Sequence, residues 1–77
     1  MSQLLTVDLA DRPDALTRVL TVLRRRRCQV TSVEFVAPDR HYAGRLIVGI
    51  VAPPAHAHCV PAWLENLVEV RGVTAGQ

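Results

Sequence analysis

The chain has 77 residues, enough for one small domain whose hydrophobic core is marginal without a partner. Apolar residues make up 49% of it, which excludes a disordered chain, yet no run reaches the ~20 apolar residues of a membrane span. The chain has nine arginines, no lysine and seven acidic residues, and its formal charge of +2 does not by itself indicate nucleic-acid binding. The first residues lack a basic segment followed by a long apolar one, so we expect no secretory signal and a cytoplasmic protein.

The first element that we expect is a strand over residues 4–10, in which apolar and polar side chains alternate. A turn follows, with Asp11 as the expected N-cap of a helix and Pro13 in its first turn. Apolar residues then recur at the helical spacing i, i+3, i+4 and i+7 and form one stripe: Leu16, Val19, Leu20 and Leu23. Four arginines at 24–27 follow where the helix should end, near residue 26, and the last of them replaces the usual helix-ending glycine.

Two further strands are expected over residues 29–37 and 45–52. The first is rich in β-branched residues, and the second is apolar on both faces, which is typical of a central strand. Residues 38–44 contain Pro and Gly among polar residues, so the chain should reverse between them. Pro53 and Pro54 end the later strand.

A second helix is expected over residues 56–67, followed by a short fourth strand over residues 68–73. Pro61 could sit in the first turn of this helix, which would shift its start toward His58 or Cys59. The order β-α-β-β-α-β predicts an α+β, ferredoxin-like fold: a four-stranded antiparallel sheet with both helices on one face. The uncovered face should carry a mixed set of side chains: Thr6, Asp8, Glu34, Ile47, Val51, Glu69 and Arg71. We expect one domain over residues 1–77, with its core between about 3 and 75.

Candidate catalytic and metal-binding groups are few. There is no nucleophile elbow, no Gly-rich phosphate loop and no pair of carboxylates on one face, so we expect neither enzymatic activity nor a cofactor. His56, His58 and Cys59 could bind zinc or copper, but three ligands within four residues at a helix start can rarely all reach one ion. Cys28 and Cys59 are expected to be reduced thiols.

The arginine run could also contact the phosphates of a nucleic acid. However, the chain has one Phe, one Tyr and one Trp, and therefore lacks the aromatic platform of an RNA-binding sheet. A solvated helix end that steers an acidic partner is the alternative that we favour. The turn before the first helix gathers free N–H groups and a positive dipole end, so it could bind a small anion such as an amino-acid carboxylate.

Four stretches together resemble an ACT domain, and more narrowly that of the small regulatory subunit of acetolactate synthase (acetohydroxyacid synthase). These are Leu-Leu-Thr-Val-Asp-Leu at 4–9, Asp-Arg-Pro-Asp-Ala-Leu-Thr-Arg-Val at 11–19, Cys-Gln-Val-Thr-Ser-Val at 28–33 and Leu-Glu-Asn-Leu-Val-Glu-Val-Arg-Gly-Val at 64–73. The resemblance implies a homodimer formed by extending the sheet across two chains, with an amino-acid effector at their interface, for which a branched-chain amino acid is the candidate. The residues that it places at the effector site are Asp11, Arg12, Pro13, Asp14, Ala15, Leu16, Gln29, Val30 and Thr31.

The sequence departs from the family pattern at that site. The family has Asn-x-Pro-Gly before the helix and a second Asn at the strand, whereas this chain has Asp11, Asp14 and Gln29 in those places. The Asp14 carboxylate would repel an effector carboxylate a few ångströms away by ~1 kcal/mol or more when both are partly desolvated. The chain resembles the short type of small subunit, which can activate the thiamine-diphosphate-dependent catalytic large subunit without valine inhibition. The alternative is a free-standing homodimeric ACT amino-acid sensor that acts on another protein; neither function involves nucleic acid or a membrane.

Overall fold

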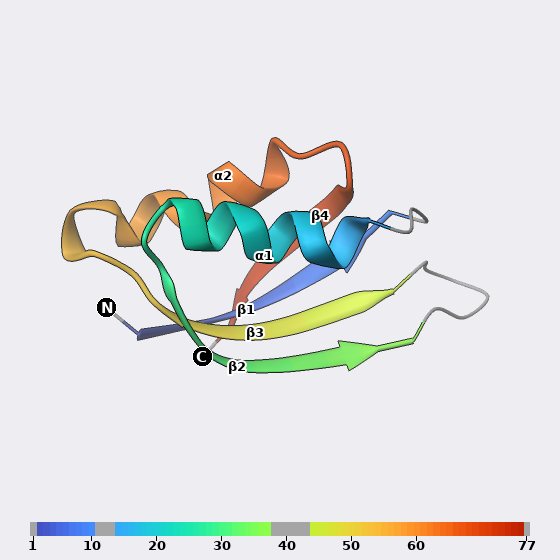
Figure 1. The fold of residues 1–77 in the computed structure, drawn as a ribbon, viewed down its shortest axis with the longest axis horizontal. Helices are drawn as coiled ribbons and strands as arrows, with labels where there is room; N and C mark the ends of the chain where they lie inside the picture. The colour runs from blue at the N-terminus through green and yellow to red at the C-terminus, as the bar shows by residue number, and fades with distance from the viewer. Residues whose placement is uncertain (1, 11–13, 38–43, 77) are drawn as a thin grey trace.

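Four strands and two helical segments form two layers, the sheet on one side and the helices on the other (Figure 1). The computed structural model describes residues 2–10, 14–37 and 44–76. The elements in chain order are β1 (Ser2–Leu9), α1 (Ala15–Arg25), β2 (Gln29–Val36), β3 (Arg45–Val51), the 3₁₀ helix η1 (Pro54–Cys59), α2 (Val60–Glu65) and β4 (Val70–Gly76). The strand order is β2-β3-β1-β4 and every neighbouring pair is antiparallel, so the predicted ferredoxin-like fold is confirmed.

The core lies between the sheet and the helices. Alternate residues of β1 and β3 face the helices and are fully buried, as strand geometry requires: Leu5, Val7, Leu46, Val48 and Ile50. Val19 and Leu23 of α1 and Val60 and Leu64 of the second helical segment meet them and are equally buried. β3 and β1 are the central strands, in agreement with the prediction for residues 45–52.

The uncovered face of the sheet carries an ion pair and lacks Glu69, which was predicted there. Asp8 and Arg45 pair there across β1 and β3, with Arg45 Nε donating to Asp8 Oδ1 at 3.1 Å. Both side chains are about two-fifths exposed, at 42% and 39%, so the pair contributes under ~1 kcal/mol. Glu69, predicted on this face, instead lies in the turn before β4 and is only 7% exposed. The prediction failed because β4 begins at Val70 rather than at residue 68.

The two ends of α1 differ in how well the sequence predicts them. The N-cap is Asp14, not Asp11, and the helix begins at Ala15, so the prediction of the helix start is wrong by about three residues. Both positions hold an Asp, and cap chemistry alone cannot choose between them. Asp11, Arg12 and Pro13 lie outside the described residues.

The other end of α1 closes on a left-handed residue. Arg27 has φ of 61°, and Cys28 N–H donates to the carbonyl of Leu23 at 2.9 Å, as in a Schellman motif. Glycine usually takes the left-handed place in this motif, because a side chain there costs roughly 1–2 kcal/mol. Arg27 therefore adopts a strained left-handed backbone conformation, as its place at the usual helix-ending glycine predicted.

The second helix is shorter than the predicted span of 56–67. A 3₁₀ helix over Pro54–Cys59 leads into α2 over Val60–Glu65, whose N-cap is Cys59 and whose first turn contains Pro61. The N–H of Val70 then bonds to the carbonyl of Leu67 and turns the chain into β4. Pro61 has no N–H to donate, so it fits the first turn of a helix that begins at Val60 but would interrupt one that began at His56.

Substituting Arg27→Gly should stabilise the fold by about 0.5–1 kcal/mol, since the relief of left-handed strain exceeds the added entropy of the unfolded chain. Arg24→Gly is the matched control: it removes the same charge inside α1 and should cost about 1 kcal/mol. Urea unfolding followed by circular dichroism measures both. A destabilised Arg27→Gly variant would mean that the Arg27 side chain contributes more than its backbone costs.

Candidate functional site

β2 is an edge strand whose apolar side chains are poorly covered. It pairs with β3 on one side, and no described strand pairs with its other side. Val33 and Phe35 lie opposite Val48 and Leu46, so they face the same side of the sheet as the core. They are nevertheless 49% and 47% exposed. An unpaired backbone edge next to exposed apolar side chains is a surface suited to pairing with another strand.

The start of β2 contains an irregularity that the sequence did not reveal. The register with β3 shifts between Val30 and Ser32, which leaves Thr31 as the extra residue of a β-bulge. A Cβ on Gly49 of β3 would lie 2.5 Å from Ser32 Oγ and 2.9 Å from Thr31 Oγ1. Gly49 therefore makes room for two hydroxyls beside the edge. The only sequence signal was a glycine within a run of apolar β-branched residues.

The residues predicted to bind an effector fall into two separate groups within one chain. Asp14 is exposed, Ala15 is buried and Leu16 is partly buried at the N-terminal end of α1. Gln29, Val30 and Thr31 are exposed at the start of β2, which follows the C-terminal end of the same helix. The eleven residues of α1 separate the two groups by about 16 Å, at 1.5 Å per residue (Figure 1). A single chain does not form a site from both groups.

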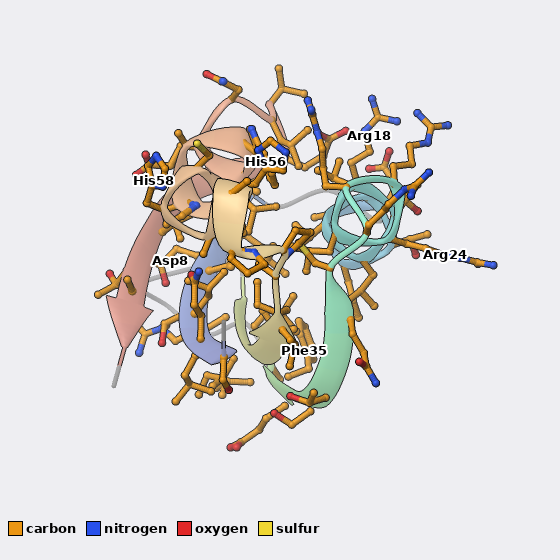
Figure 2. All side chains as sticks on the ribbon, turned by 90° about the vertical axis from the view of Figure 1, so that its left-hand side faces the viewer. Asp8, Arg18, Arg24, Phe35, His56 and His58 are labelled. Carbon is orange, nitrogen blue, oxygen red and sulfur yellow. The ribbon has the colours of Figure 1, made fainter. Side chains whose placement is uncertain are left out.

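The histidines and cysteines do not converge on a metal site. His56 packs against Trp63 with their ring centroids 5.9 Å apart, whereas His58 lines a cavity with Gln3 and Pro61 on another side (Figure 2). Among the described residues, no three His, Cys, Asp or Glu side chains lie close enough to share an ion. Cys28 and Cys59 are both free thiols, as expected.

A second concave region lies between the two helices. Val22, Trp63 and Leu67 form its apolar part, and Arg25, Arg26 and Asn66 form its polar part. Its cavity volume is about 280 Å³. The apolar stripe of α1 did not predict that α1 would line a cavity together with α2 and the segment after it, because Val22 lies beside that stripe.

No helix in the described part of the chain is long and apolar enough to cross a membrane.

With strand order β2-β3-β1-β4 and both helical segments on one face, the chain has the ferredoxin-like fold of ACT domains. It superposes on the ACT domain of the GTP pyrophosphokinase of Chlorobium tepidum with a TM-score of 0.76 at 8% identity, covering 99% of this chain and 97% of that one. The sequence prediction of an ACT fold is confirmed.

The small subunit of acetolactate synthase from Thermotoga maritima superposes with a TM-score of 0.81 at 19% identity. The match covers 97% of this chain and 47% of the small subunit, so the chain spans about half the length of that protein. The C-terminal domain of the MgtC protein from Mycobacterium tuberculosis is also similar, with a TM-score of 0.66 at 20% identity over 96% of this chain and 85% of that one. Neither a protein-family model nor a curated protein sequence matches the chain.

The two thiols should react at different rates. Burial raises the pKa of the Cys28 thiol, so less of it is thiolate at pH 8, while Cys59 is partly exposed. Reaction of the native protein with a chromogenic disulfide at pH 8 should show a fast phase that Cys59→Ser abolishes and a slow phase that Cys28→Ser abolishes. The slow phase should accelerate as the pH rises. Equal rates for both thiols would contradict the burial of Cys28.

Proposed function

We propose that this protein is a homodimeric, non-catalytic regulatory subunit that binds and activates the catalytic subunit of acetolactate synthase. The observation that carries the proposal is the open apolar edge at β2 in a chain whose fold superposes on an acetolactate synthase small subunit at a TM-score of 0.81. Pairing of two β2 edges would cover the exposed apolar side chains, and it would relate the two protomers by the twofold symmetry that is usual in homodimers.

Antiparallel pairing of two β2 strands would also complete the divided effector site. In such a pair, the start of one β2 lies opposite the end of the other. The end of β2 lies on the same side of the molecule as the N-terminus of α1 (Figure 1). Gln29 of one protomer would therefore approach Asp14 of its partner. The dimer brings together the two groups that α1 separates within one chain.

Asp14 governs whether the interface can bind the carboxylate of an amino acid. Its exposed carboxylate lies at the N-terminal end of α1, where it complements the helix dipole but repels another carboxylate. Arg18, one turn further on, is also exposed, and the structure gives it no ion pair with Asp14 in the described part of the chain. The proposed dimer is therefore an activator in which branched-chain amino acids bind weakly, or not at all, at this interface.

Activation requires no chemistry from this chain. A subunit that binds the active conformation of its partner more tightly than the inactive one shifts the population toward the active conformation. A tenfold shift needs a difference of about 1.4 kcal/mol in binding free energy between the two conformations.

Breaking the β2 edge should dissociate the dimer. We expect Val33→Asp together with Phe35→Asp to weaken dimerisation by at least about tenfold, because two carboxylates from each protomer would be buried at the interface. Both side chains are half exposed, so the fold should survive. Val68→Asp is the matched control, since Val68 is 72% exposed and lies outside β2. Sedimentation velocity over a concentration series measures the dissociation constant. If the unsubstituted protein sediments as a monomer at every concentration, the proposed dimer is wrong.

The activation itself is tested with the catalytic subunit from the same genome. Addition of this protein should raise acetolactate formation, and calorimetric titration of the dimer alone with valine, leucine and isoleucine should give little heat. Asp14→Gly should restore binding by removing the repulsion, by about fivefold at ~1 kcal/mol. Strong binding by the parent protein, with no effect on the catalytic subunit, would instead favour a free-standing amino-acid sensor.

A further inference from the structure

The concave region between α1 and the second helix joins an apolar surface to a cluster of positive charge. Val22, Trp63 and Leu67 supply the apolar surface and are all only partly buried by the core. Arg25 and Arg26 lie along one side of it. We call this region, lined by these five residues and Asn66, the interhelical groove. It is separate from the β2 edge and from both groups of the predicted effector site.

The guanidinium of Arg26 lies over the ring of Trp63. The carbon atom at the centre of its guanidinium lies 4.7 Å from the centre of the Trp63 ring, a cation–π arrangement. His56 lies beside the same indole, with 5.9 Å between the ring centroids. Stacking engages the face of a guanidinium and leaves its N–H groups, which point outward in the plane, available to a carboxylate.

The charge in this region is not neutralised within the described residues. Arginines 24–27 form no ion pair there, whereas the ion pair that the structure contains, Asp8 with Arg45, lies on the other face of the sheet. Glu65 is exposed on α2 but does not line the groove. Four cations at the end of one helix, beside an apolar recess, complement a ligand that carries several negative charges and one apolar group.

From this combination we infer that the interhelical groove binds an acidic segment of a protein partner. One apolar side chain of that segment occupies the recess over Trp63, Val22 and Leu67, and neighbouring carboxylates bind Arg25 and Arg26. This inference does not depend on which protein the chain regulates. A nucleic acid fits less well, because Arg26 already covers a face of the only tryptophan and leaves no free aromatic platform for bases.

A synthetic peptide can serve as the probe. It has one leucine between four glutamates on either side, and Trp63, the single tryptophan, reports its binding by fluorescence. We expect saturable binding at ~50 mM salt that weakens as the salt concentration rises. Replacing the leucine by glycine should weaken binding by about tenfold, the equivalent of losing one buried aliphatic side chain.

The variants separate a specific groove from general attraction to a basic protein. Arg25→Gln with Arg26→Gln should weaken binding by at least about tenfold, as measured by calorimetry so that altered Trp63 emission does not interfere. Arg24→Gln removes a neighbouring charge that projects from α1 away from α2 (Figure 2), and should weaken binding by less than about threefold. All three side chains are exposed, so thermal melting should be nearly unchanged.

Three results would overturn the inference. The first is the absence of saturable binding of the peptide to the parent protein. The second is an equal loss, per arginine removed, for Arg24→Gln and for the groove variants, which would indicate general electrostatic attraction. The third is tighter binding of a short uridine oligonucleotide with the same dependence on Arg25 and Arg26, which would assign the groove to nucleic acid.

Discussion

The helical layer is too small for the sheet that it covers, and this mismatch governs the outer surfaces of the protein. α1 has 11 residues, and η1 and α2 have six each, against four strands of seven or eight residues. The core-facing residues of β1 and β3 are buried, whereas Val33 and Phe35 of β2 remain about half exposed. Val33 and Phe35 carry the apolar pattern of core residues without the burial. Association with another chain is the general way in which small domains cover such surfaces.

The sequence predicted the fold well, because its signals were local and strong. The stripe of Val19 and Leu23 predicts a helix, and the alternation in β1 predicts a strand. The apolar run of β3 is assigned to a strand by its β-branched residues and by the prolines that follow it. The boundaries were less predictable. Asp11 and Asp14 offer the same cap chemistry, and the span of 56–67 combined a 3₁₀ helix, a short α-helix and a turn that periodicity cannot separate. Glu69 was misplaced as a consequence of the error at the start of β4.

The candidate site was less accessible from the sequence than the fold. Resemblance grouped residues near 14 with residues near 30, but no spacing rule reveals that α1 places these groups at its two ends. The interhelical groove depends on a contact between residues 26 and 63, which are distant in sequence. Aromatic and cationic residues are each common on protein surfaces, so only a three-dimensional structure could associate this particular pair.

The bulge at Thr31 bears on how copies of this chain can aggregate. A flat, regular edge strand is a template onto which further strands can add at any register, and this is how fibrils grow. The extra residue between Val30 and Ser32 interrupts the even spacing of the β2 edge and increases its local twist. At the opposite edge, the register between β1 and β4 also shifts, beside Leu9 and Val70. Each edge of the sheet thus contains an irregularity that disfavours open-ended growth while still permitting a closed pair.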